Sequence, residues 1–347
     1  MRVFVTGGTG FIGYPLTRSL IARGWDVVAL VRNPDSPRSR AVAKLGAHCL
    51  AGDVTDRESM RAGMTAADLV VHNAGWYELG VTRPARRLMH ATNVTGTDNV
   101  LGLALELGVP RSVYVSSVAY YGGSGPVARD ETYRRQAPCR SYYEQTKVAA
   151  HDVAGRYQQR GLPLIVVCPA NVAGPNDHSV LGYYLRMYLN RVMAPVGFSP
   201  EMIISTAHVD DVAEGIALAA EKGRIGETYI LAGDAMSVRE TFDLWSTAPG
   251  AFKVRWYLPF WLARMMYAPL GPVLRLAGLP AFISGETIRA SGESYCFSGA
   301  KAVRELGWTH RPAPAMWREV INREVELLAA RKGCSLALRL KPVEAFD

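Results

Sequence analysis

Thr6-Gly7-Gly8-Thr9-Gly10-Phe11-Ile12-Gly13 follows the apolar run Val3-Phe4-Val5 and leads into an amphipathic stretch. Three glycines in a G-x-x-G-x-x-G spacing, between a predicted strand and a predicted helix, are typical of a turn that binds a dinucleotide. We expect Gly7 to permit the bend, Gly10 to let the backbone approach the pyrophosphate, and Gly13 to let the helix pack closely. The predicted cofactor contacts in this turn are Gly7, Thr9, Gly10, Phe11, Ile12 and Gly13. The alternative is a turn without a ligand.

Short apolar runs alternate with amphipathic stretches through the first half of the chain. This alternation is typical of strand–helix–strand units, and unbroken apolar runs suit strands buried on both faces. The predicted strands are 3–5, 27–31, 69–72, 113–116 and 164–168, and the main predicted helices begin near 12 and span 93–107, 141–160 and 209–222. The sequence therefore predicts an α/β fold with a Rossmann-type doubly wound parallel sheet.

The texture of the sequence changes after Cys168, where proline, glycine and aromatic residues become frequent. We therefore predict a dinucleotide-binding domain at 1–171 and 205–236, and a smaller, discontinuous substrate-binding lobe at 172–204 and 237–347. Within this lobe, 259–268 and 317–330 are predicted as helices.

Composition narrows the classes of function. The net charge of +8 is scattered rather than gathered in runs, so we expect no nucleic-acid partner. Five cysteines at irregular spacing fit neither a zinc site nor a disulfide framework, and the N-terminus leaves no room for a signal peptide, so we expect a cytoplasmic protein without a metal. Arginines and prolines interrupt the most hydrophobic stretch, so no membrane span is expected; the amphipathic stretch 254–276 leaves weak peripheral membrane association as an alternative.

Arg32 follows the second predicted strand, where dinucleotide-binding folds often place an acidic residue for the adenosine ribose. A guanidinium there can pair with a 2′-phosphate, so NADP(H) is favoured as cofactor and NAD(H) is the alternative; Arg32 as a solvated loop charge is the third hypothesis. Asp53, with Val54 beside it, is placed to receive the adenine amino group, or else it caps the next helix.

Tyr143 and Lys147 form a Tyr-x-x-x-Lys pattern in a predicted helix, where this spacing brings both side chains to one face. Ser116 and Ser117 end a predicted strand, and carboxyl ends of parallel strands meet at the ligand crevice. A phenol, an ammonium and a hydroxyl are therefore expected to converge on one site. The alternative is a tyrosine and a lysine on an ordinary helix surface.

Further motifs extend the pattern to residues 1–240: AGD at 51–53, NVTGT at 93–97, YVSSVAYYG at 114–122, YEQTK at 143–147, PANVAGP at 169–175 and HVDDVA at 208–213. With the glycine-rich turn, they make the sequence resemble the extended short-chain dehydrogenase/reductase superfamily, in its NAD-dependent epimerase/dehydratase and dihydroflavonol-reductase-like branch. The remainder of the chain resembles this superfamily more loosely, and a homodimer is implied by the resemblance alone.

The resemblance implies roles for the matching residues. Tyr143 would donate or accept the substrate proton, Lys147 would favour the phenolate and bind the nicotinamide ribose, and Ser117 would hold the substrate oxygen. Further cofactor contacts are implied for Asn73, Ala74, Gly75, Asn93, Ser116, Pro169, Asn171 and Val172. A plain turn is the alternative for 73–75 and helix capping for Asn93, whereas His72 and His208 are expected to be buried and hydrogen-bonded.

Two reactions fit these residues. One is hydride reduction of a hydrophobic ketone or aldehyde, or oxidation of a secondary alcohol; the other is epimerisation or dehydration of a nucleotide sugar. Asn171 favours the second reaction, whereas Ile204, where such enzymes use an arginine for the diphosphate, favours the first. The first is also favoured by an apolar group that supplies wall for a substrate or else core for the lobe: Trp256, Tyr257, Phe260, Trp261, Met265, Met266 and Tyr267. A non-catalytic dinucleotide-binding protein is the third hypothesis, which the Tyr143/Lys147 pair opposes.

Overall fold

The computed structural model describes residues 1–262, 265, 286, 289, 292–331 and 333–342. Its largest sheet has seven strands in the order β11-β7-β5-β4-β1-β2-β3, and every neighbouring pair is parallel. These strands are β1 (Arg2–Thr6), β2 (Asp26–Val31), β3 (His48–Ala51), β4 (Leu69–His72), β5 (Ser112–Val115), β7 (Leu164–Pro169) and β11 (Thr228–Leu231). The predicted α/β fold with a doubly wound parallel sheet is confirmed.

The order of the strands creates a switch point beside β1. From β1 the chain continues outward through β2 and β3, and then returns to build β4, β5, β7 and β11 on the other side. In such sheets, ligands bind beyond the carboxyl ends of the strands at the place where the order reverses. The glycine-rich turn after β1 and the turn after β4 both lie there.

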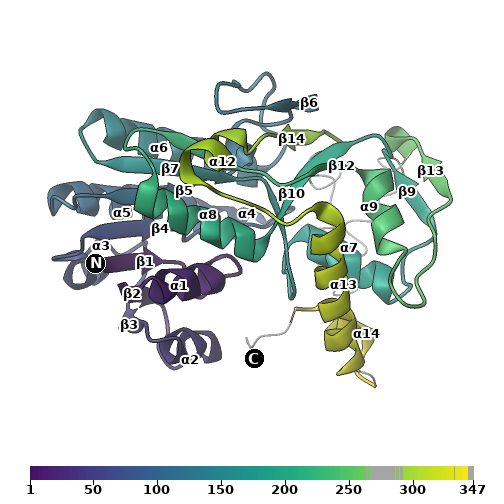
Figure 1. Ribbon diagram of the computed structural model, residues 1–347, viewed down its shortest axis with the longest axis horizontal. Coiled ribbons are helices and arrows are strands. Elements are labelled where there is room, and N and C mark those ends of the chain that lie inside the picture. Colours follow the sequence, from purple (N-terminus) through teal and green to yellow (C-terminus); the bar gives the residue numbers. More distant parts are fainter. Residues whose placement is uncertain (263–264, 266–285, 287–288, 290–291, 332, 343–347) are drawn as a thin grey trace.

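Helices cover both faces of this sheet (Figure 1). On β1, Val3 and Val5 face one helical layer whereas Phe4 faces the other, as alternation along a strand requires. One layer contains α1 (Gly13–Ala22), α2 (Pro37–Lys44), α8 (Val209–Lys222) and α12 (Ala300–Leu306). The other contains α3 (Arg57–Met64), α5 (Gly96–Glu106) and α6 (Tyr142–Gln159), and α4 (Arg83–His90) contacts α6.

A second group of elements packs around its own apolar cluster, at the right of Figure 1. Its helices are α7 (Val180–Leu189), α9 (Val238–Trp245), α13 (Ala313–Ala329) and α14 (Leu336–Leu340). The smaller sheets of the molecule comprise β6 (Gly125–Arg129), β8 (Asn171–Ala173), β9 (Val196–Phe198), β10 (Ile203–His208), β12 (Ala235–Ser237), β13 (Trp256–Leu258) and β14 (Tyr295–Phe297). Strands β8, β12 and β13 contribute to the second cluster, whereas β14 packs against the core of the large sheet. Strand β6 belongs to the predicted dinucleotide-binding domain, but it pairs with β14 of the predicted substrate-binding lobe. The division into two domains therefore remains a proposal.

Two predicted helices begin earlier than the sequence indicated. The helix predicted at 93–107 is preceded by α4 and by one turn of π-helix, η1 (Ala91–Thr95). Helix α4 can begin at Arg83 because Thr82 caps it and because the first turn of a helix tolerates proline. Helix α13 starts four residues before the predicted 317, again next to prolines. The predicted helix at 259–268 and the stretch 254–276 lie partly outside the described residues, and Met266 and Tyr267 lie wholly outside them.

The helices that the structure describes include none that is both long enough and apolar enough to cross a bilayer. Trp256, Trp261 and Met265 are 70%, 62% and 65% exposed, so for these three residues the alternative of a core role in the lobe is wrong. Tyr257 packs against the apolar cluster of the lobe, in agreement with the core alternative for this residue.

Candidate active site

The glycine-rich turn has the geometry of a cradle. Gly7 has a φ of +70°, and a Cβ there would lie 2.7 Å from the backbone of Ala74 in the neighbouring turn. A Cβ at Gly13 would lie 1.9 Å from the Gly7 carbonyl oxygen, so only glycine allows α1 to start this close to the turn. The amide of Gly10 donates to the Gly7 carbonyl over 3.0 Å, which closes the bend. The residues present therefore fit a dinucleotide whose pyrophosphate lies at the N-terminus of α1.

The neighbouring turn after β4 is held against this cradle. Asn73 donates through Nδ2 to the Gly7 carbonyl over 3.3 Å, and the Ala74 amide donates to the Thr6 hydroxyl over 3.2 Å. The turn at 73–75 is therefore more than a plain connection, because two of its residues hydrogen-bond the glycine-rich turn. Phe11 packs edge-on against His178, with ring centroids 5.6 Å apart, whereas Ile12 packs into the apolar layer below.

Arg32, Asp53 and Val54 are the residues predicted to lie near the adenosine of the cofactor. Arg32 is exposed directly after β2. The carboxylate of Asp53 accepts from the amide and hydroxyl of Thr55, whereas Asp56 caps α3. The alternative that Asp53 caps the helix is therefore wrong. Val54 is buried, and its carbonyl accepts from Asn99 of α5 over 2.9 Å.

Asn93 lies inside the π-turn and is buried, so the alternative that it caps a helix is wrong. Its side chain accepts from the Trp76 amide over 2.7 Å and donates to the Trp76 carbonyl over 2.9 Å. It also lies within 3.0 Å of the Thr146 hydroxyl on α6. Asn93 thus ties the loop after β4 to the helix that carries Tyr143 and Lys147.

Ser117 and Tyr143 are hydrogen-bonded, and Lys147 lies four residues after Tyr143 on α6. Burial raises the pKa of Tyr143 to about 12, and a hydrogen bond with Ser117 opposes that rise. Lys147, only 7% exposed, donates to the Val115 carbonyl over 3.2 Å, and burial lowers its pKa to about 8. The phenol of Tyr143 thus keeps its proton at neutral pH, and the pKa of the Lys147 ammonium lies close to neutral pH. Such a pair is suited to proton transfer.

Tyr77 is a neighbour of Tyr143 that the sequence analysis did not single out. The two rings meet edge to face with centroids 4.8 Å apart, and Tyr77 is 39% exposed. The aromatic pair Trp76-Tyr77 directly after the predicted turn at 73–75 is the signal that could have found it.

The remaining predicted residues border this region less directly. Pro169 ends β7, and Asn171 and Val172 begin β8, where they pair in parallel with Thr206 and Ala207. Asn171 is exposed, and Ile204 lies on β10.

Both histidines that we expected to be structural are buried. His72 lies between the hydroxyls of Thr6, at 2.8 Å, and Thr97, at 3.0 Å. His208 caps α8 by accepting from the Asp210 amide over 3.2 Å. His208, Asp210 and Glu319 lie close enough together to hold a metal ion. The guanidinium of Arg311 lies within 3.7 Å of both carboxylates, however, and supplies their positive charge.

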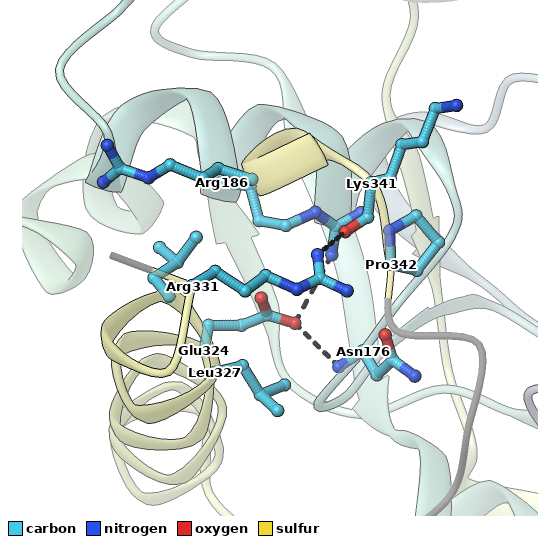
Figure 2. Close-up of a pocket in the computed structure, with 9 residues that line it drawn as sticks. Asn176, Arg186, Glu324, Leu327, Arg331, Lys341 and Pro342 are labelled. Carbon is cyan, nitrogen blue, oxygen red and sulfur yellow. Dashed lines mark hydrogen bonds and ion pairs between the residues drawn. The ribbon is translucent and has the colours of Figure 1, made fainter. Parts of the chain in front are cut away.

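A separate polar pocket lies between α7, α13 and α14 (Figure 2). Arg186 and Glu324, each 2% exposed on its side chain, form an ion pair of 3.4 Å in its wall. The cavity measures about 10 Å³, room for roughly one water-sized sphere, so it is too small for a substrate. The ion pair in its wall connects α7 to α13.

Comparison with known proteins gives consistent matches. A model of the NAD dependent epimerase/dehydratase family matches residues 3–232. A protein of Stigmatella aurantiaca, named 4-hydroxy-2-methyl-3-oxo-4-farnesyl-3,4-dihydroquinoline-1-oxide ketoreductase, is 32% identical over 317 residues, which are 90% of this chain and 92% of that protein.

Among solved structures, the crystal structure of gox2253 is 32% identical with a TM-score of 0.79, covering 94% of this chain and 98% of that chain. UDP-glucose 4-epimerase of Thermotoga maritima, solved with UDP-glucose, has a TM-score of 0.74 at 22% identity and covers 94% of this chain and 100% of its own. At that identity the likeness concerns the fold alone.

Proposed function

The chain belongs to the NAD-dependent epimerase/dehydratase family, and from this membership we propose that it is an NADP(H)-dependent oxidoreductase of hydrophobic carbonyl compounds. The family and the ketoreductase relative make it an NAD(P)-dependent enzyme of the extended short-chain dehydrogenase/reductase type. The proposed reaction is reduction of a ketone or aldehyde, or the reverse oxidation of a secondary alcohol. The observation that carries the proposal is the hydrogen bond of Tyr143 with Ser117, together with the position of buried Lys147 four residues further along the same helix.

In this reaction the bound nicotinamide supplies or accepts the hydride. Ser117 holds the substrate oxygen within reach of Tyr143, and Tyr143 gives that oxygen its proton when the carbonyl is reduced. Lys147, one helical turn along α6, provides the positive charge that favours the resulting phenolate. Arg32 pairs with a 2′-phosphate, which favours NADP(H) over NAD(H).

Two features support a hydrophobic substrate. The rings of Tyr77 and Tyr143 meet edge to face, so an aromatic side chain borders the phenol. The ketoreductase of Stigmatella aurantiaca is named for a farnesylated quinoline oxide, a ketone with a long apolar chain. We extend to this chain only the substrate class, a carbonyl on an apolar molecule.

Asn171 favours a second candidate function, epimerisation or dehydration of a nucleotide sugar. It is exposed at the start of β8, where enzymes of that kind hold a diphosphate. Ile204, part-buried on the adjacent β10, offers no guanidinium for the same group. A diphosphate would therefore lose a charge-assisted, bidentate contact.

A substrate screen separates these candidates. Purified protein is mixed with NADPH or NADH and a panel of apolar ketones and aldehydes, with UDP- and dTDP-sugars in parallel. We expect loss of nicotinamide absorbance with apolar carbonyls and no change in the sugars by chromatography. Conversion of a nucleotide sugar without net NADPH oxidation would support the second candidate. Binding of NADPH without any turnover would support a non-catalytic protein.

A further inference from the structure

His151 continues the catalytic face of α6. It follows Lys147 by four residues and Tyr143 by eight, so the three side chains lie along one side of the helix. The imidazole stacks on the ring of Tyr120 with centroids 3.6 Å apart and an angle of 9° between the planes. This stacking fixes the orientation of the imidazole.

Hydrogen bonds connect His151 to the surroundings of Lys147. Its Nδ1 lies 3.0 Å from the hydroxyl of Ser116, the last residue before Ser117. Ser116 in turn hydrogen-bonds the phenol of Tyr114, which lies 3.5 Å from Nζ of Lys147. Lys147 is thus joined to His151 through two hydroxyl groups.

The far edge of the imidazole reaches solvent. Among the described residues, Nε2 of His151 has no hydrogen-bond partner, and it is not one of the buried polar atoms that lack one. Tyr114 and Ser116 are buried, whereas His151 is part-exposed. The connected groups therefore run from the interior, beside Lys147, to the surface.

Resting on the proposed function, we propose that His151, Ser116 and Tyr114 form a proton relay between solvent and the Lys147/Tyr143 pair. Reduction of a carbonyl takes one proton from Tyr143, and Lys147 replaces it. Tyr114 then gives its proton to the amine of Lys147, Ser116 gives one to Tyr114, and His151 gives one from Nδ1 to Ser116. Solvent protonates Nε2, so each relay group gains one proton and loses one.

The groups around the imidazole keep it neutral between transfers. Burial lowers the pKa of His151 to about 4, with further lowering by the charges of Lys147 and Arg134. The other polar groups that face it are the Ser116 hydroxyl and the stacked phenol of Tyr120. A neutral imidazole can accept a proton at one nitrogen while it donates from the other.

The relay predicts a specific kinetic pattern for His151→Asn. Enzyme with bound NADPH still holds the proton of Tyr143, so the first turnover needs no relay. We expect stopped-flow absorbance to show one NADPH oxidised per site at the wild-type rate, followed by steady-state turnover about tenfold slower or more. Millimolar imidazole in the buffer should restore the steady state.

His90→Asn, which removes an exposed histidine from α4, is the matched control and should behave as wild type. Melting temperature and NADPH affinity identify variants that fold poorly. The relay is overturned if His151→Asn keeps the wild-type steady state, or if both phases slow together and imidazole restores nothing. Wild-type enzyme that reduces no carbonyl would instead overturn the proposed function itself.

Discussion

At the scale of single residues, Tyr143 is distinguished by its neighbours rather than by its type. Tyr142 precedes it on α6, and the guanidinium of Arg86 lies 5.1 Å from the centre of its ring. Tyr143 instead meets Ser117 and shares a helix face with Lys147. Two adjacent phenols therefore differ in what they can do.

Replacing Tyr143 by phenylalanine should lower kcat by about 10²–10⁴-fold, because the substrate oxygen loses its proton donor. NADPH binding, followed by fluorescence titration, should stay within about twofold of the wild type. Tyr142→Phe is the matched control and should retain its activity. Equal activity of the Tyr143 variant and the wild type would remove Tyr143 as the acid.

Arg32 is expected to decide the choice of cofactor. Substitution by aspartate should lower the preference for NADPH over NADH, measured as the ratio of kcat/KM values, by about tenfold or more, since a charge-assisted contact is replaced by repulsion. Arg40→Asp places the same charge change on an exposed arginine of the adjacent α2 and should alter the ratio far less. An unaltered ratio for Arg32→Asp would leave Arg32 as a solvated loop charge.

At the scale of elements, the sequence predicts best where a side chain obeys a repeating pattern. The strands 69–72 and 164–168 agree with β4 and β7 to within one residue, and the helix 209–222 agrees with α8, because apolar periodicity determines them. Helix α4 was not predicted because its residues are mostly polar and include a proline. The sequence leaves Asn93 as a possible cap because no local pattern predicts a π-turn in the middle of a helix.

The pair Arg186–Glu324 holds helices α7 and α13 together (Figure 2). Glu324→Gln should lower the free energy of unfolding by about 3–5 kcal/mol, measured by urea denaturation, because the buried guanidinium loses its counter-charge. Arg323 and Glu326, 2.9 Å apart on the exposed side of α13, provide the control pair. Glu326→Gln should cost less than about 1 kcal/mol. Similar costs for both variants would mean that burial adds nothing to the first pair.

At the scale of the whole molecule, the sequence predicts which residues meet at the carboxyl ends of the strands but not what surrounds them. Motifs at 6–13, 116–117 and 143–147 are local, and the topology of a doubly wound sheet brings them together. Tyr77 and His151 belong to no motif, and Tyr114 only begins the motif at 114–122; the contacts of all three depend on how loops and helix faces pack. Pattern alone does not contain that information.

The same burial that shapes the site should make the fold sensitive to acid. Burial lowers the pKa of His151 to about 4 and that of His72 to about 3, from 6.5. Between pH 6.5 and 4 the unfolded chain therefore binds more protons than the native one, so the free energy of unfolding falls as the pH falls. Buried acids such as Glu324, whose pKa is raised, act in the opposite direction.

A difference between variants isolates the contribution of His151 to this acid sensitivity. Urea denaturation of wild type and His151→Asn at pH 6.5, 5.5, 4.5 and 4 should show that wild type loses about 3 kcal/mol more over this range, because asparagine binds no proton when the chain unfolds. His90→Asn should follow the wild-type curve. Parallel curves for wild type and His151→Asn would mean that the native imidazole is already charged near pH 6. The ring would then be hydrated rather than packed between Tyr120 and Ser116.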